Sequence, residues 1–209
     1  MPAVRLAARV AAAVAVAAVA AVQPPAQPLT ADQRLVAALP AAVTAPAPGY
    51  DRDLFGAWAD LDGDGCDSRQ AVLLRTLEEQ VTAPDRPTEC TIVLSGTLQD
   101  PYTGTRAAVA ASHVDIDHRV ALRDAWESGA STWTEEWRRD FANDEDNLLP
   151  TLPGVNRSKG ARGPDQWAPG GGKAAECAYA AGYAHTKARW ELGVTDAQRA
   201  ALIRLLNGC

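Results

Sequence analysis

Four cysteines constrain the fold of this 209-residue chain more than any other feature of its sequence. They are Cys66, Cys90, Cys177 and Cys209, and they follow an N-terminal segment with the layout of an export signal. An even number of cysteines in an exported chain favours two disulfides over free thiols, and four cysteines allow three pairings. No pair has the C-x-x-C spacing that soft zinc sites usually show. We expect Cys66 to pair with Cys90 and Cys177 with Cys209, because each of these pairs flanks a predicted helix.

The export signal occupies the first 22 residues. Arg5 and Arg9 precede an uncharged Ala/Val run of thirteen residues, 10–22, that ends in small side chains. This order is typical of a cleaved signal peptide, and the run is shorter than the ~20 residues that a membrane-spanning helix needs. An uncleaved N-terminal anchor is the alternative. We therefore expect a secreted, extracellular protein that has no membrane association after signal cleavage.

Composition and charge restrict the classes of fold and function. The length suits one domain, and 47% hydrophobic residues with only 6% aromatic residues fit a modest core built from helices and a few short strands. The chain carries 20 Lys and Arg against 26 Asp and Glu, a net charge of −6. An acidic protein does not coat nucleic acid by bulk charge, so any site for a polyanion must be local.

The order of sequence patterns predicts an α+β protein. Residues 23–48 are rich in Pro, Ala and Gln, and we assign them to a linker that contains one short helix. Residues 49–209 form the expected folded domain. Helical patterns cover residues 51–58, 68–81, 122–141 with a break at Gly129, 173–190 and 195–206. Strand patterns cover residues 91–94, 107–116 and 147–152, and the first two can pair as a hairpin.

The stretch His113-Val-Asp-Ile-Asp-His118 carries the most chemistry in the sequence. Strand alternation places His113, Asp115 and Asp117 on one face, and a turn brings His118 beside Asp117. A carboxylate oxygen next to a nitrogen base is what metal-assisted hydrolysis of a phosphodiester requires. By itself, the Asp-His pair fits equally a surface hydrogen bond between an aspartate and an imidazole.

Two further segments extend this pattern into a family resemblance. Asn147 lies 29 residues after His118, and Asn156-Arg-Ser-Lys159 begins nine residues later. Together with Asp117-His118 they resemble the HNH, or ββα-metal, nuclease motif. The wider pattern, which includes Asp100-Pro-Tyr-Thr-Gly104, is similar to secreted bacterial HNH endonucleases related to the C-terminal domain of GmrSD-type restriction enzymes. The resemblance covers residues 50–209 and implies a ββα-metal core embedded in a mostly helical single domain.

The resemblance also implies roles for individual residues. His118 becomes the general base that takes a proton from the attacking water, and Asn147 completes the catalytic motif by bracing the loop around it. Asp117 and Asn156 become the ligands of one divalent cation, with Asp115 supporting them. Amide and carboxylate oxygens suit hard ions, so Mg²⁺ or Mn²⁺ is the expected metal.

A nuclease with an acidic chain needs local cations for its substrate. Arg157 and Lys159 follow Asn156, and Arg119 follows His118, so we expect these three side chains to contact phosphates; Arg123 is a further candidate. Phosphate contacts position a nucleic acid without reading its sequence. The expected activity is therefore hydrolysis of DNA, with RNA as an alternative substrate, and with little sequence specificity.

An acidic segment supports a rival function. Asp60-x-Asp62-x-Asp64-Gly65 begins like a calcium-binding loop, but the twelfth position from Asp60 is Ala71 rather than the Glu of an EF-hand. We expect a compact acidic turn, with a structural Ca²⁺ at Asp60, Asp62 and Asp64 as the alternative. The rival to a nuclease is a non-catalytic extracellular module that binds calcium or the cell envelope.

Overall fold

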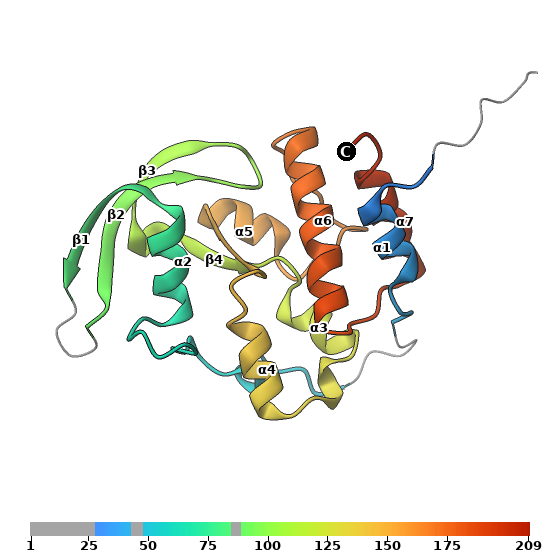
Figure 1. The fold of residues 1–209 in the computed structure, drawn as a ribbon, viewed down its shortest axis with the longest axis horizontal. Coiled ribbons are helices and arrows are strands. Elements are labelled where there is room, and N and C mark those ends of the chain that lie inside the picture. The colour runs from blue at the N-terminus through green and yellow to red at the C-terminus, as the bar shows by residue number, and fades with distance from the viewer. Residues whose placement is uncertain (1–27, 43–47, 85–88) are drawn as a thin grey trace, which may run out of the picture.

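The structure is a computed structural model that describes residues 28–42, 48–84 and 89–209. The expected signal peptide, residues 1–22, lies outside the described residues. The described chain has a mixed α+β architecture with two hydrophobic cores. A three-stranded sheet with one helix forms one end of the molecule in Figure 1, and a group of three helices forms the other end. A two-stranded sheet and short helices connect them.

The sheet at one end is antiparallel, with strand order β1-β2-β3. The strands are Glu78–Pro84 (β1), Thr91–Gln99 (β2) and Arg106–Ala110 (β3). Helix α2, Ser68–Thr76, packs against this sheet and buries Val72 and Leu73. The Asp67 side chain accepts the backbone N–H of Gln70 and caps the helix.

The predicted helix over residues 68–81 is wrong at its C-terminal end, where the chain forms strand β1. The helix begins at Ser68, with Asp67 as its N-cap, but it ends at Thr76. The chain then pairs with β2, and Val81 lies opposite Ser95. The apolar stripe that predicted a longer helix contains Val81, which is exposed in the structure. Pairing with a distant strand therefore determines the conformation here, and the local pattern does not.

The predicted hairpin is confirmed in β2 and β3, but the predicted strand over residues 107–116 is divided. A 3-10 turn, η2 at Ala111–His113, separates β3 from β4, Asp115–His118. Strand β4 leaves the first sheet and pairs antiparallel with β5, Leu148–Thr151. Helix α5, Pro153–Lys159, follows β5 directly and contacts β4. This strand, strand and helix unit lies at the centre of the molecule (Figure 1).

The connection from β4 to β5 is helical, as the sequence predicted. It contains α3 at Leu122–Glu127, the 3-10 helix η3 at Ala130–Thr132 and α4 at Glu135–Ala142. The predicted break occurs at Gly129, whose φ of 149° is a conformation that other residues rarely adopt. These elements bring the carbonyl end of α4 back to β4.

Three helices contribute to the second core, which also contains residues of α3, η3 and α4. The three helices are α1, Ala31–Ala38; α6, Lys173–Arg189; and α7, Asp196–Leu205. Thr195 and Gln198 form the expected capping box at the start of α7. Helix α1 was expected within a linker, but Val36 is completely buried against this core. Packed structure therefore begins before residue 49, where the sequence placed the start of the folded domain.

Both expected disulfides are present. Cys66–Cys90 connects the turn before α2 to the start of β2, with 5.0 Å between the Cα atoms. Cys177–Cys209 connects α6 to the C-terminus, with a Cα separation of 5.8 Å. Each bridge therefore fixes one of the two ends of the molecule. In the described part of the chain, no helix has both the length and the apolar character to cross a membrane.

Candidate active site

A cleft of about 340 Å³ opens where the end of β4 meets α5. Asp117, His118 and Asn156 all line it. Its remaining lining residues are Tyr50, Arg52, Ile116, Ala121, Leu122, Arg123, Gly160 and Ala161. The carboxylate, the imidazole and the amide that the sequence selected therefore share one cleft, although they come from two elements that are far apart along the chain.

The His118 imidazole is held by a carbonyl group and an aromatic ring. Its Nε2 atom lies 2.8 Å from the carbonyl oxygen of Ala142, at the end of α4. A carbonyl oxygen can only accept, so Nε2 donates the hydrogen bond and Nδ1 of the neutral ring keeps its lone pair. The indole of Trp58 stacks on the imidazole with a centroid separation of 5.7 Å and an interplanar angle of 6°. These two contacts leave Nδ1 as the nitrogen that can take a proton.

Burial keeps this imidazole neutral. Burial, together with the positive charges of Arg52 and Lys159, lowers the pKa of His118 from 6.5 to about 3, although the hydrogen bond to Ala142 acts in the opposite direction. The ring is therefore uncharged at physiological pH. A neutral imidazole with a free lone pair, at the wall of a cleft, can act as a general base.

The Asp117 carboxylate is buried and fixed at both oxygens. Its Oδ2 atom accepts from the Tyr102 hydroxyl at 2.6 Å, and its Oδ1 atom accepts from Nζ of Lys159 at 3.0 Å. Burial raises the pKa of Asp117, and the Lys159 charge and the Tyr102 hydrogen bond offset part of that effect. A carboxylate oxygen has a second lone pair, so both atoms can still bind a cation. The carboxylate is thus held in one orientation, but it still has lone pairs that can bind a cation.

Lys159 differs from its expected position. The sequence placed it with Arg157 in a basic surface patch that contacts phosphate, but its side chain is completely buried. Its ammonium group donates to Asp117 and, at 2.8 Å, to the backbone carbonyl of His118. Lys159 therefore joins α5 to the end of β4 and neutralises the buried carboxylate.

Asn156 and Asp115 support each other at the edge of the cleft. Nδ2 of Asn156 donates to Oδ2 of Asp115 at 3.0 Å. This contact fixes the orientation of the amide and leaves its Oδ1 atom as an acceptor. Asp117 and Asn156 together offer one carboxylate and one amide oxygen, a donor set that fits a hard divalent cation. The expected supporting role of Asp115 is consistent with this contact.

Asn147 is buried behind the cleft and does not line it. Its Oδ1 atom accepts from the backbone N–H of Val120 at 2.8 Å, and its Nδ2 atom donates to the Val120 carbonyl at 3.1 Å. Its own carbonyl accepts from the N–H of Arg119 at 2.8 Å. Asn147 therefore braces the loop directly after His118.

Two of the side chains that were expected to contact phosphate, Arg119 and Arg157, do not line the cleft. Arg119 points away from the cleft and lines a separate cavity, where it donates to the Asp146 carbonyl at 3.0 Å. It also packs against α6 at Gly182, where an added Cβ would lie 2.1 Å from its Nη1 atom. Arg157 is exposed on α5 but does not line the cleft. The arginines that do line it are Arg123 and Arg52, and nothing in the local sequence around Arg52 indicated this.

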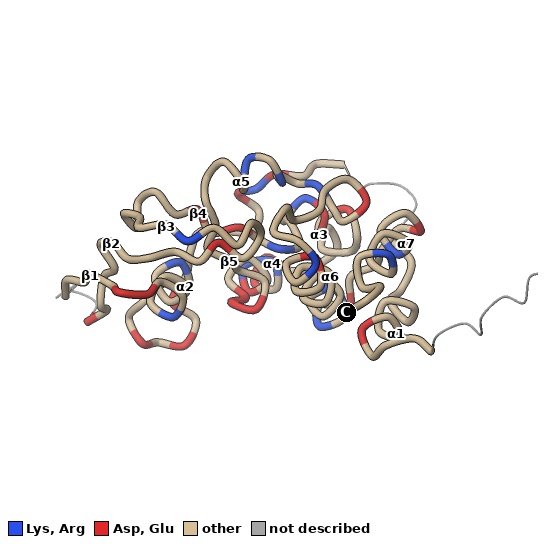
Figure 2. The backbone as a smooth tube through the Cα atoms, turned by 90° about the horizontal axis from the view of Figure 1, so that it is seen from above, with Lys and Arg blue, Asp and Glu red and all other residues tan. Residues whose placement is uncertain are grey.

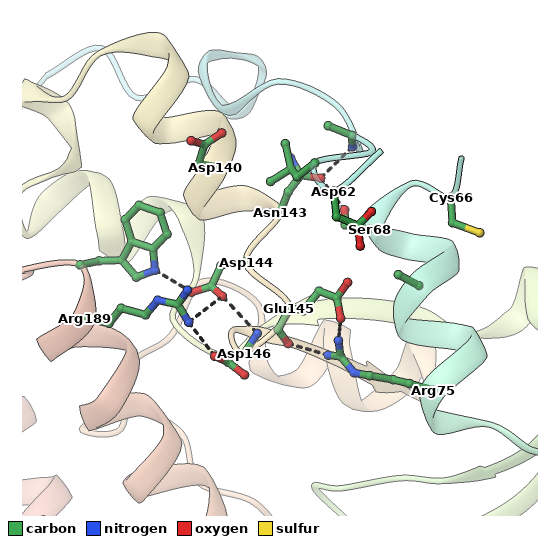
Figure 3. A pocket seen from close by; sticks show the side chains of 14 residues that line it. Asp62, Cys66, Ser68, Arg75, Asp140, Asn143, Asp144, Glu145, Asp146 and Arg189 are labelled. Atoms are coloured by element: carbon green, nitrogen blue, oxygen red, sulfur yellow. Dashed lines mark hydrogen bonds and ion pairs between the residues drawn. The ribbon is translucent and has the colours of Figure 1, made fainter. Parts of the chain in front are cut away.

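A larger cavity of about 510 Å³ lies beside α2 and α4, and its lining is acidic. Figure 3 shows that both of its arginines are already paired, Arg75 with Glu145 and Arg189 with Asp144 and Asp146. Asp62 and Asp140 also line the cavity, so acidic side chains outnumber arginines in its lining, and Asp140 is itself paired with Arg139. Figure 2 shows the same contrast along the backbone, with acidic residues beside α2 and around α4 and basic residues on α5. A polyanion is therefore disfavoured in the larger cavity.

The Asp60, Asp62 and Asp64 segment forms an exposed acidic turn. The carboxylate oxygens of these three residues lie within 4.8 Å of one another. Asp60 accepts the backbone N–H groups of Gly63 and Gly65 at 2.7 and 2.9 Å, and these bonds lower its pKa. Backbone N–H groups of the turn therefore donate to the carboxylates of the same turn. Calcium at this position remains the alternative prediction.

Comparisons with known proteins identify the family of the chain. Residues 67–205 match the family model described as GmrSD restriction endonucleases, C-terminal domain. An uncharacterized secreted protein from Arthroderma benhamiae is 38% identical over 180 residues, which cover 85% of this chain and 84% of the relative. No solved structure matches the chain. The predicted secretion is confirmed by this relative, which is a secreted protein. The relative is fungal, so the expected resemblance to bacterial enzymes in particular is not confirmed.

Proposed function

The chain belongs to the family of GmrSD restriction endonuclease C-terminal domains, and from this membership we propose that it is a secreted, metal-dependent endonuclease that hydrolyses phosphodiester bonds of DNA. The observation that carries the proposal is the cleft that Asp117, His118 and Asn156 share. A base and two oxygen ligands on one cleft wall are the parts that one-metal phosphodiester hydrolysis needs.

The local topology supports an assignment to the ββα-metal class. Strands β4 and β5 are antiparallel, and α5 follows β5 without an intervening loop. His118 ends the first strand, Asn147 immediately precedes the second, and Asn156 lies on the helix. The order strand, strand and helix corresponds to the name ββα, and the three motif residues lie at the end of the first strand, just before the second strand and on the helix.

The proposed reaction begins with proton transfer to His118. As a water oxygen attacks phosphorus, its proton moves to Nδ1 of the imidazole, and the bond from phosphorus to the 3′ oxygen breaks. The products are a 5′ phosphate and a 3′ hydroxyl, whose proton comes from solvent. Positioned proton transfer of this kind contributes about 10²- to 10⁴-fold to a rate. Ala142 and Trp58 prepare the imidazole by fixing its tautomer and its plane.

Asp117 and Asn156 would hold the cation, for which we propose Mg²⁺ or Mn²⁺. When bound, such an ion neutralises charge on the phosphate and on the leaving oxygen. Lys159 and Tyr102 keep the Asp117 carboxylate in one orientation, and Asp115 does the same for the Asn156 amide. The protein therefore supplies a prearranged pair of oxygen ligands and leaves the remaining coordination positions for water and substrate.

A plasmid assay tests the proposal. The purified secreted protein is incubated with supercoiled plasmid in the presence of Mg²⁺, Mn²⁺ or Ca²⁺, with and without EDTA. We expect Mg²⁺ or Mn²⁺ to support conversion to nicked and then linear DNA, and EDTA to stop it. Intact plasmid with every metal, from a protein shown to be folded by circular dichroism, would favour the non-catalytic rival. A parallel reaction with a structured RNA determines whether RNA is also a substrate.

A further inference from the structure

The segment that precedes the family-matched region forms one wall of the cleft. The family model begins at residue 67, yet Tyr50 and Arg52 line the cleft and Trp58 stacks on His118. These residues bracket the 3-10 helix η1, Arg52–Phe55. The matched region therefore supplies the catalytic residues but does not account for the whole cleft.

This wall is fixed in place by aromatic packing. Phe55 is completely buried and contacts the rings of Tyr50, Trp126 and Phe141, with centroid separations of 6.2 to 6.4 Å. The Asp51 side chain caps η1 by accepting a backbone N–H at 3.0 Å. The backbone that carries Arg52 is therefore anchored to the same core as α3 and α4.

Arg52 presents an unpaired cation to the cleft. Across residues 28–42, 48–84 and 89–209, its guanidinium group makes no hydrogen bond or ion pair. It lines the same cleft as His118, and burial followed by the Arg52 charge lowers the pKa of that imidazole. A cation held beside the base without a protein partner is available to an anionic ligand.

Arg123 provides a second cation on the same wall. It starts from α3, lies over the Tyr50 ring at 5.9 Å from the centroid, and donates from Nε to Glu127 at 2.9 Å. Its terminal nitrogens remain for a ligand. Among the residues that line the cleft, the acidic one is Asp117, which Lys159 already neutralises. Glu127 offsets the charge of Arg123, so the unpaired charge in this cleft is the positive charge of Arg52, in contrast to the larger cavity of Figure 3.

We propose that Arg52 and Arg123 form the phosphate-binding wall of the cleft and hold the backbone of the nucleic-acid strand next to the bond that is cut. This inference rests on the proposed function. A guanidinium group binds phosphate through two parallel hydrogen bonds, and such contacts position a strand without reading its bases. The sequence had named Arg123 as a candidate for this role, and Arg52 joins it in place of Arg157, Lys159 and Arg119.

Salt-dependent binding tests this inference separately from catalysis. The binding of a fluorescein-labelled 20-base-pair DNA duplex is followed by anisotropy in EDTA, where no cleavage occurs, at NaCl concentrations from 50 to 200 mM. The variants are Arg52→Ala, Arg52→Glu and Arg123→Ala. Arg204→Ala is the matched control, because Arg204 is an exposed arginine on α7, away from the cleft.

We expect each alanine variant in the cleft to weaken binding about five- to tenfold at low salt and to reduce the slope of log K against log[NaCl] by about 0.9. Arg52→Glu should weaken it more, and Arg204→Ala should match the wild type. If the wild type cuts plasmid while Arg52→Ala keeps its affinity and salt slope, the inference is wrong and the proposed function stands. If the wild type neither binds the duplex nor cuts plasmid, both are wrong.

Discussion

The Nε2 atom of His118 lies 2.8 Å from the carbonyl oxygen of Ala142, and this contact determines which imidazole nitrogen keeps its lone pair. A carbonyl accepts but does not donate, so Nε2 carries the proton. We expect long-range ¹H–¹⁵N NMR spectra at pH 7 to show a protonated Nε2 and an unprotonated Nδ1. A proton on Nδ1 at this pH would contradict the assignment of His118 as the base.

The buried imidazole should also make stability depend on pH. The pKa of His118 is about 3 in the folded protein and 6.5 when the ring is exposed. Between these values the unfolded chain binds a proton that the native ring does not, so the free energy of unfolding falls as pH falls through this window and is unaffected above it. From pH 6.5 to pH 4 this single group should account for a loss of about 3 kcal/mol.

Urea unfolding of the wild type and of His118→Ala at the two pH values measures this loss. The raised pKa of Asp117 acts in the opposite direction in both proteins, so the difference between them isolates His118. We expect the wild type to lose more stability than the variant on acidification. Equal losses in the two proteins would show that His118 is not neutral and buried in the native state.

Lys159 should contribute to stability far more than its neighbour Arg157. Lys159→Met removes a fully buried cation and leaves the Asp117 carboxylate without its partner, which typically costs about 3 to 5 kcal/mol. Arg157→Ala, on the exposed face of the same helix, should change stability by less than about 0.5 kcal/mol. Chemical denaturation measures both. The double variant Lys159→Met/Asp117→Asn should recover part of the loss, and near-equal effects of the two single variants would refute the buried pair.

Trp58 should act on turnover through the orientation of His118. Trp58→Phe keeps an aromatic ring on the imidazole and should retain kcat within about threefold, whereas Trp58→Ala removes the stacked partner. Because misplacing a catalytic group by about 1 Å can reduce a rate about 100-fold, we expect kcat to fall at least tenfold in Trp58→Ala while KM changes less. Trp137→Ala, at a half-exposed position on α4, is the control. Equal kcat values for the Phe and Ala variants would argue against this role.

Much of the fold could be predicted because its signals are local. The capping box at Thr195 and Gln198, the break at Gly129 and both disulfide pairings follow from residue types and spacing within short segments. Strand β1 could not be predicted in this way. Its residues continue the apolar stripe of α2, and only the pairing of Val81 and its neighbours with β2 makes them a strand.

In the candidate site, too, local signals were predictable and contacts between distant segments were not. The motif residues Asp117, His118 and Asn156 were recognised from their order, and Arg123 was named as a candidate, but the positions of Lys159 and Arg52 were not predicted. Lys159 lies three residues after Asn156, one helical turn away, and this spacing was a signal that both face β4. Arg52 gave no such signal, because its position depends on the packing of Phe55 against residues far along the chain.

The most direct test of the account is the rate at which His118→Ala cuts supercoiled plasmid with Mg²⁺ or Mn²⁺, compared with the wild type and with His185→Ala. His185 is an exposed histidine on α6 and lies outside the cleft, so its replacement controls for the loss of an imidazole elsewhere. We predict that His118→Ala binds DNA but cuts it at least about 100-fold more slowly, and that His185→Ala cuts at the wild-type rate. A folded His118→Ala protein that cuts at the wild-type rate would contradict this prediction.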